Sequence, residues 1–116
     1  MTQDFPHDET GELLRLMQEQ GDDLSVARDI DFYLIFDTRD EATAFASRVD
    51  LGPEFRVSTA HYEKTAKWQA SLTVHMAPVY AELLMLEKQV ARLGRNYGGQ
   101  PDGWGCSPAA TKGTGP

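Results

Sequence analysis

The stretch IDFYLIF, Ile30 to Phe36, is the segment on which the whole fold depends. It is almost continuously apolar, and several of its side chains are aromatic or β-branched, which is typical of a strand. It ends at the polar run DTRDE, residues 37–41. Strands without polar alternation are usually covered on both faces. We therefore predict a strand that is buried on both faces and lies at the centre of a sheet.

A helix is predicted directly after this strand. Thr38 and Glu41 have the S/T-x-x-E spacing of a capping box, which satisfies two backbone N–H groups at a helix start. Gly52 and Pro53 end the helical pattern. The apolar residues of the helix recur on one face at Ala42, Phe45, Ala46 and Val49.

Two strands are predicted after that helix. Their segments are EFRVSTAHY, residues 54–62, and KWQASLTVHM, residues 67–76, and both alternate between apolar and polar side chains. In the second segment, alternate residues from Trp68 to Met76 face one way and the polar residues face the other. The polar run EKT lies between the segments. We therefore predict an antiparallel hairpin of two half-buried strands.

Two further helices are predicted, one on each side of this region. The first spans residues 12–20 and ends at Gly21, a residue type that favours the left-handed end of a helix. The second begins near Pro78, which is tolerated in a first helical turn, and has about four turns. Its apolar residues step by four, three, four and three, at Val79, Leu83, Leu86, Val90 and Leu93.

Together these elements predict an α+β fold. One open antiparallel sheet with its helices on one face would bury all of the apolar stripes. The expected architecture is a ferredoxin-like α/β sandwich with an extra N-terminal helix and a weak or missing fourth strand, for which Tyr97 and the following segment are candidates. The single domain spans residues 10–106, between a flexible N-terminus at residues 1–9 and a disordered tail at residues 107–116.

The net charge of −7 is unevenly distributed along the chain. Residues 1–50 contain thirteen acidic and four basic residues, whereas residues 51–116 contain five acidic and seven basic residues. An acidic half disfavours a phosphate-binding surface, which needs clustered lysine and arginine. It would suit a basic protein partner, which it would attract electrostatically. The same acidity could also serve solubility alone.

The chain is expected to work in the cytoplasm. It contains one cysteine, Cys106, so it cannot form an intramolecular disulfide framework. No apolar run approaches the length of a membrane span. The polar, acidic start MTQDFPHDET lacks the basic and apolar regions of a signal peptide.

The sequence predicts no metal site, no cofactor and no catalytic group, so we expect no enzyme. His7, His61 and His75 lack metal-ligand spacing with one another or with Cys106. No feature places a base beside Cys106, and no phosphate-binding loop is present. The adjacent acids Asp22 and Asp23 lie in the polar connector DDLSVARD, where we expect both to be solvated.

The order of strands and helices also fits RNA-recognition modules, which stack bases on aromatic side chains of the sheet. However, Trp68 is predicted on the face that the helices cover, and the opposite face of its strand has no aromatic residue. Together with the net acidity, this argues against direct nucleic-acid binding.

The segment GGQPDGWGC, residues 98–106, contains one of only two tryptophans among four glycines and a proline. Pro101, Asp102 and Gly103 have the chemistry of a turn, and Gly105 allows another element to approach closely. We therefore predict a tight loop that holds Trp104 in place. The side chain could plug one end of the core, serve as an exposed anchor for a partner, or do both.

The sequence resembles the ribonuclease E inhibitor family, also described as regulator of ribonuclease activity B. The resemblance covers roughly residues 10–106, and DGWG is its most specific part. Founding members end in a long acidic tail, whereas the tail here, SPAATKGTGP, is short and almost neutral. The segments that carry the resemblance are GDDL at 21–24, DFYLIFDTRDEA at 31–42, WQASLTVHMAP at 68–78 and DGWGC at 102–106.

The resemblance implies a non-catalytic regulator that binds ribonuclease E and restrains RNA cleavage. A small-ligand-binding domain or an oligomeric ferredoxin-like module are the alternatives, and a deep pocket under Trp104 would favour the first of these. The predicted partner contacts are the acids Asp22, Asp23, Asp37 and Asp40 and the loop residues Asp102, Gly103, Trp104 and Gly105.

Overall fold

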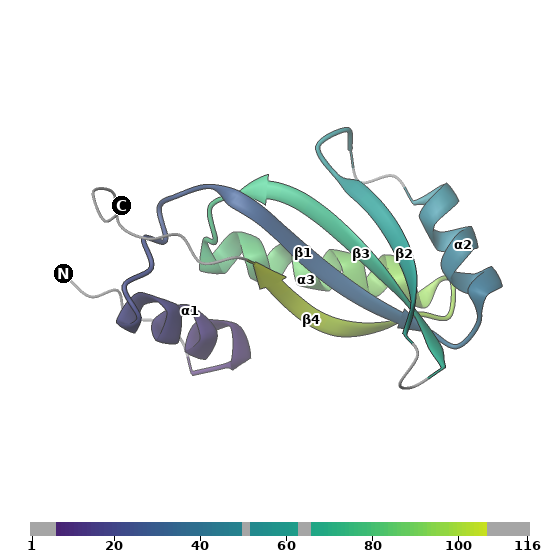
Figure 1. The fold of residues 1–116 in the computed structure, drawn as a ribbon, viewed down its shortest axis with the longest axis horizontal. Coiled ribbons are helices and arrows are strands. Elements are labelled where there is room, and N and C mark those ends of the chain that lie inside the picture. The colour runs from purple at the N-terminus through teal and green to yellow at the C-terminus, as the bar shows by residue number, and fades with distance from the viewer. Residues whose placement is uncertain (1–6, 50–51, 63–65, 107–116) are drawn as a thin grey trace.

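The computed structural model describes residues 7–49, 52–62 and 66–106. Three helices and four strands lie within these residues (Figure 1). Their order along the chain is α1 (Glu9–Glu19), β1 (Arg28–Phe36), α2 (Arg39–Arg48), β2 (Arg56–Tyr62), β3 (Lys67–Met76), α3 (Tyr80–Arg95) and β4 (Gln100–Cys106).

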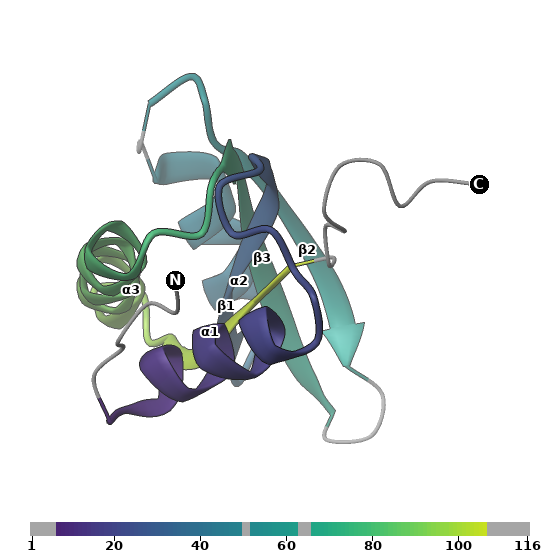
Figure 2. The same cartoon turned by 90° about the vertical axis from the view of Figure 1, so that its left-hand side faces the viewer.

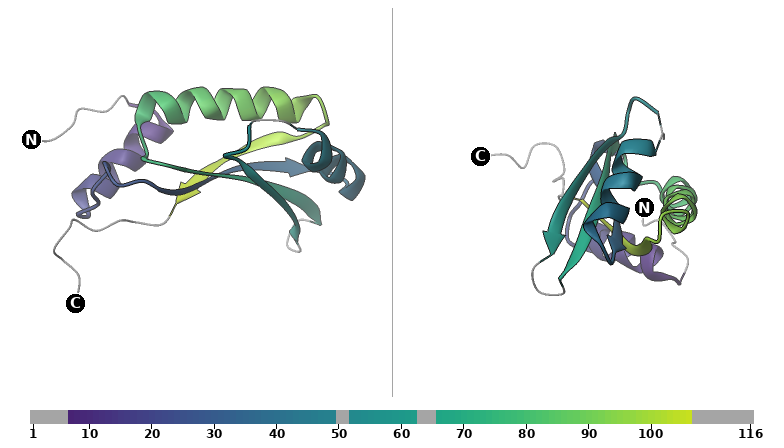
Figure 3. Two further views of the ribbon diagram at one scale, coloured as in Figure 1. Left: turned by 90° about the horizontal axis from the view of Figure 1, so that it is seen from above. Right: turned by 90° about the vertical axis from the view of Figure 1, so that its right-hand side faces the viewer.

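The four strands form one antiparallel sheet in the order β2-β3-β1-β4. This order, with α2 joining β1 to β2 and α3 joining β3 to β4, is the ferredoxin-like arrangement that the sequence predicted. Figure 3 shows α3 lying along one face of the sheet, with α2 towards one end and α1 at the other. The predicted central position of β1 and the β2–β3 hairpin are both confirmed.

The prediction that β1 is buried on both faces is wrong. Its residues alternate, and those on the helix side are buried while those on the other side are exposed or half-buried. The reason is that the helices lie on one face only, which leaves Asp29, Asp31 and Tyr33 on an uncovered face. The buried side chains are Ile30, Phe32, Leu34 and Phe36, and β3 adds Ala70, Leu72 and Val74 opposite them.

The last turn of α3 and the residue before β4 lie very close to β1. A Cβ on Gly94 would be 2.7 Å from Leu34 Cδ2, and a Cβ on Gly99 would be 2.7 Å from the ring of Phe36. Real Cβ atoms do not come so near to a side chain. Glycine at these two positions therefore allows the end of α3 to pack directly on β1.

The fourth strand is present, and the predicted tight loop around Trp104 is wrong. Residues 100–106 form the edge strand β4, which pairs antiparallel with β1. The register shifts between the pairs Phe32–Trp104 and Leu34–Pro101, so two residues of β4 lie opposite one residue of β1. The residues with turn chemistry therefore form a β-bulge, in which Gly103 has φ +85°. Proline is tolerated here because β4 is at the edge of the sheet.

The helix boundaries largely agree with the sequence. The capping box of Thr38 and Glu41 is present at the start of α2, and Gly21 follows α1 with φ +92°. Helix α1 begins at Glu9, inside the stretch predicted to be a flexible N-terminus. Residues 1–6, the hairpin turn at 63–65 and the tail at 107–116 lie outside the described residues. No helix in the described part of the chain is long and apolar enough to cross a membrane.

Candidate partner-binding surface

Helix α1 crosses close to one end of α3 (Figure 2). Two polar contacts hold the two helices together. The side chain of Asp8 caps α1 by accepting from the Gly11 N–H at 2.7 Å, and it also accepts from the Tyr80 hydroxyl. These two hydrogen bonds lower the pKa of Asp8, chiefly through Tyr80. The contact therefore contributes fully at neutral pH, and it is lost in acid as the pH falls below the ordinary carboxyl value. The second contact is the Thr10 hydroxyl, which donates to Glu87 Oε1 at 2.7 Å.

Trp104 links β4 to the same helix pair. It pairs with Phe32, so its side chain is on the helix side of the sheet, where the half-buried indole packs against the core. The indole N–H donates to Thr10 Oγ1 at 3.2 Å, and Thr10 donates onward to Glu87. A single hydrogen-bonded chain thus joins β4, α1 and α3. The predicted packing role of Trp104 agrees with this position, and part of its surface stays accessible.

The accessible part of Trp104 lines a groove between α1 and β4, here called the α1–β4 groove. Its volume is about 280 Å³, which is below the roughly 300–1,000 Å³ typical of small-ligand sites. The deep pocket that would favour a small-ligand function is therefore not found under Trp104. The groove is lined by Leu13, Met17, Gln20, Trp104, Gly105 and Cys106.

The exposed side of α1 next to this groove carries a row of carboxylates. Glu9, Glu12 and Glu19 are exposed, and Leu16 between them is 49% exposed. Their spacing of three, four and three residues places all four side chains on one helical face. We call this face the acidic stripe of α1. It combines negative charge with one exposed large apolar side chain.

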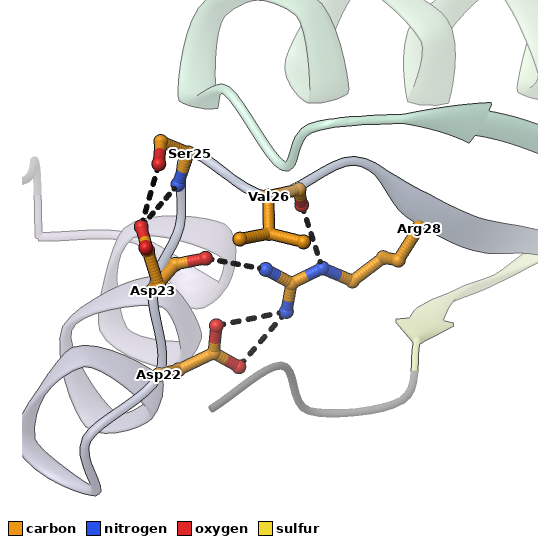
Figure 4. Close-up of polar contacts among 5 residues, drawn as sticks. All are labelled: Asp22, Asp23, Ser25, Val26 and Arg28. Atoms are coloured by element: carbon orange, nitrogen blue, oxygen red, sulfur yellow. Dashed lines mark hydrogen bonds and ion pairs between the residues drawn. The ribbon is translucent and has the colours of Figure 1, made fainter. Parts of the chain in front are cut away.

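The connector between α1 and β1 is organised by a buried arginine (Figure 4). The side chain of Arg28 is 7% exposed and that of Asp22 is 3% exposed, and Nη1 of Arg28 lies 2.9 Å from both oxygens of the carboxylate. The same guanidinium donates to the backbone carbonyls of Val26 at 3.1 Å and Asp23 at 2.7 Å. The prediction that Asp22 is solvated is wrong, because its carboxylate is buried and forms an ion pair with Arg28.

Asp23 has a local role in the same connector. Its Oδ1 accepts from the Ser25 hydroxyl at 2.6 Å and from the Ser25 N–H at 3.1 Å, which stabilises the turn into β1. These bonds, led by the hydroxyl, lower the pKa of Asp23. The GDDL segment that carries the family resemblance is therefore a structural connector that sets how α1 meets β1.

The structure does not bring the eight predicted contact residues together. Asp22 and Asp23 precede β1, whereas Asp37 and Asp40 follow it, so the nine residues of β1, a strand about 26 Å long, lie between the two pairs. Asp37 accepts from Lys67 Nζ at 2.5 Å, and Asp40 is exposed in the first turn of α2. The residues of β4 lie between the two ends, where Asp102 and Gly103 are exposed and Trp104 and Gly105 are half-buried.

The uncovered sheet face is polar on β3, as predicted, and it also holds polar residues of β1 and β2 that the sequence interpretation missed. Asp29 accepts a hydrogen bond from Arg56 at 2.8 Å, and its carboxylate lies 3.1 Å from His75 Nδ1. Both partners lower the pKa of Asp29, and His75 has the larger effect. Asp31 accepts from the Thr73 hydroxyl, while burial raises the pKa of Tyr33. All of these groups except His75 line a hollow of about 820 Å³. Beginning the strand at Arg28 would have shown the polar residues of β1, because Asp29 and Asp31 then alternate with Ile30 and Phe32.

Trp68 lies on the helix-covered face, as predicted, where His61 packs on its ring and the Arg39 guanidinium lies 5.7 Å from the ring centre. The other two histidines contact Glu12 and Asp29. Within the described ranges no three His, Cys, Asp or Glu side chains are grouped to hold a metal ion. Burial raises the pKa of the Cys106 thiol, which favours the unreactive protonated form.

The bulge in β4 leads to a stability prediction. Replacing Gly103 with alanine is expected to lower the free energy of unfolding by about 1–2 kcal/mol, because a side chain disfavours positive φ. Gly105→Ala is the matched control, since its Cβ would meet Tyr33 Oη at an ordinary 3.5 Å. Urea denaturation of both variants measures the difference. Equal losses in the two variants would contradict the bulge geometry.

Comparison with known proteins assigns the chain to a family. The family described as Regulator of ribonuclease activity B matches residues 7–106, which include every described helix and strand. No curated protein matches the sequence. The matched range begins just before the Asp8 cap of α1 and ends at the last residue of β4. The chain therefore belongs to the regulator of ribonuclease activity B family, whose members regulate ribonuclease activity.

Proposed function

We propose that this protein binds a ribonuclease E-type endonuclease in the cytoplasm and restrains RNA cleavage by that contact, without catalysing a reaction itself. Family membership supports the regulation of a ribonuclease. The net charge of −7 favours a basic protein surface as the partner. The proposal requires a docking surface that offers both negative charge and an apolar anchor point.

The α1–β4 groove together with the acidic stripe of α1 is the observation that carries this proposal. The groove offers the accessible edge of Trp104, a residue type enriched where interfaces are strongest. The stripe places three exposed carboxylates beside it, so a basic segment with one large apolar side chain would fit. Asp23 is in the connector that follows α1, and Trp104 and Gly105 line the groove, so three of the predicted contacts are retained here.

Asp37, Asp40 and Asp102 form the alternative set of contacts. They are exposed, but Asp37 already has Lys67 as a partner and Asp40 lies in the first turn of α2, where the helix dipole favours an acid. Asp37 and Asp40 thus have a structural reason for their charge. Glu9 and Glu12 also lie in a first helical turn, and Glu12 pairs with Arg15, so what distinguishes the acidic stripe is the apolar groove beside it. The proposal therefore places the main contact at the α1–β4 groove and keeps the second set as the competing location.

The test compares two triple variants that remove the same charge. One is Glu9→Gln, Glu12→Gln and Glu19→Gln in the acidic stripe, and the other is Asp37→Asn, Asp40→Asn and Asp102→Asn. Binding to a purified ribonuclease E-type endonuclease is measured by biolayer interferometry, and cleavage of an RNA substrate is followed in parallel. Circular dichroism checks that both variants are folded.

The stripe variant is expected to bind about tenfold more weakly and to restrain cleavage less, because exposed charge pairs contribute up to about 1 kcal/mol each. The aspartate variant is expected to change binding by less than about threefold. Raising the ionic strength should weaken wild-type binding. A loss confined to the aspartate variant would move the contact to the other end of β1, and wild type that does not bind the nuclease would overturn the proposal.

A further inference from the structure

The outward face of α3 is basic in a protein that is acidic overall. Lys88, Arg92 and Arg95 are exposed and follow one another at spacings of four and three residues, so they share one helical face. Together with Met85 and Gln89 they line a hollow of about 650 Å³. We call this the basic face of α3. It shares no residue with the α1–β4 groove.

The charges on this face are available to a partner. No carboxylate of the described residues lies within ion-pair distance of Lys88, Arg92 or Arg95. The helix dipole favours cations in the last turn, which accounts for Arg92 and Arg95 as structural residues. It does not account for Lys88, because the dipole acts only within the last turn.

A second, apolar hollow adjoins the basic face. Met85 belongs to both hollows and is 60% exposed, the highest exposure among the large apolar side chains described as exposed. The apolar hollow has a volume of about 190 Å³, enough for one side chain of a partner. Its lining consists of Phe55, Val74, Met76, Met85 and Leu86 together with two acidic residues, Glu54 and Glu82.

We propose that the basic face of α3 docks an acidic segment of a protein partner, which places one large apolar side chain in the hollow beside Met85. Charge complementarity sets the sign of the segment, and the adjoining hollow requires the apolar residue. Single-stranded RNA fits less well, because the basic hollow contains no aromatic side chain on which a base could stack. The protein thus has two docking surfaces of opposite charge, and this second surface does not depend on the proposed contact with the nuclease.

The test uses a defined probe and no nuclease. The probe is a fluorescein-labelled peptide of glutamates with two central leucines, and its binding is followed by fluorescence anisotropy. In one control peptide lysines replace the glutamates, and in the other serines replace the two leucines. Amide chemical shifts recorded during the titration locate the probe, and changes are expected on residues 82–95.

The decisive variants remove equal charge from different surfaces. The triple variant of the basic face combines Lys88→Ala, Arg92→Ala and Arg95→Ala, and it is expected to bind the peptide about tenfold more weakly. The single variant Met85→Ser is expected to bind it about threefold more weakly. The matched control combines Arg48→Ala, Arg56→Ala and Lys67→Ala, three exposed cations outside the basic face. It should bind the peptide nearly as well as wild type, because it leaves the basic face intact and the ion pairs that it breaks, with Asp29 and Asp37, are exposed.

Four results would overturn the proposal. They are the absence of peptide binding, equal losses in the two triple variants, chemical-shift changes away from α3, and tighter α3-dependent binding of a single-stranded RNA probe. Light scattering adds a further check. A wild-type dimer that the α3 triple variant converts to a monomer would identify a second copy of the chain as the occupant and would also refute the proposal.

Discussion

Arg28→Met is expected to lower the free energy of unfolding by about 3–5 kcal/mol, because it leaves a buried carboxylate without its partner. The Asp22 side chain is only 3% exposed, and its two oxygens are both 2.9 Å from the guanidinium. The carbonyls of Asp23 and Val26 would also lose their donors. Such a loss is a large part of the roughly 5–15 kcal/mol that stabilises a typical domain. Urea denaturation followed by circular dichroism measures it.

Two variants make the result for Arg28 interpretable. Arg56→Met breaks an ion pair with Asp29 in which both side chains are more than half exposed, and it should cost no more than about 1 kcal/mol. Adding Asp22→Asn to Arg28→Met should recover part of the loss, since the buried negative charge is then removed as well. A cost for Arg28→Met no larger than that for Arg56→Met would mean that the pair is not buried in solution.

Trp104→Ala is expected to cost about 3 kcal/mol. Fully buried tryptophans cost about 3–5 kcal/mol when truncated, and the half-buried indole belongs at the lower end of that range. The variant removes the packing of β4 beneath α1 and the hydrogen bond to Thr10. Faster hydrogen exchange of the α1 amides should accompany the loss, because this contact helps to hold α1 against the sheet.

The conservative variant Trp104→Phe separates the hydrogen bond from the packing. It keeps most of the apolar contact and loses only the indole N–H, so it should cost about 1 kcal/mol. Because it remains folded, it is also the better variant for measuring nuclease binding at the α1–β4 groove. If the two variants lower the free energy of unfolding equally, the packing of the indole does not contribute to stability. A cost below about 0.5 kcal/mol for Trp104→Ala would show that the indole is peripheral.

The elements with a regular hydrophobic period could be predicted from the sequence. The alternation from Trp68 to Met76 predicted β3 with the correct ends, and the capping box of Thr38 and Glu41 predicted the start of α2. Both signals are local, so a short stretch contains all of the information. Strand β1 was only partly predictable, because Ile35 interrupts the alternation that Asp29 and Asp31 begin.

Strand β4 and the Arg28 connector could not be predicted in this way. Gly103 and its neighbours favour turns as single residues, and only pairing with β1 makes them a bulged edge strand. In the same way, Asp22 and Arg28 are six residues apart without a regular element between them, so no period indicates that they meet. The candidate site was predictable at Trp104, whereas the acidic stripe of α1 depended on knowing which face of α1 is covered.

The position of β4 at the edge of the sheet determines when folding can finish during synthesis. Central strand β1 emerges from the ribosome early, but its edge partner β4 is the last of the described strands to be made. Ile30 therefore cannot pair with Cys106 until that strand has been synthesised. Until then, one side of β1 presents unpaired backbone groups that can pair with another nascent chain. A product that stops before residue 100 would therefore be prone to aggregation, and chaperone binding in that interval would protect the growing chain.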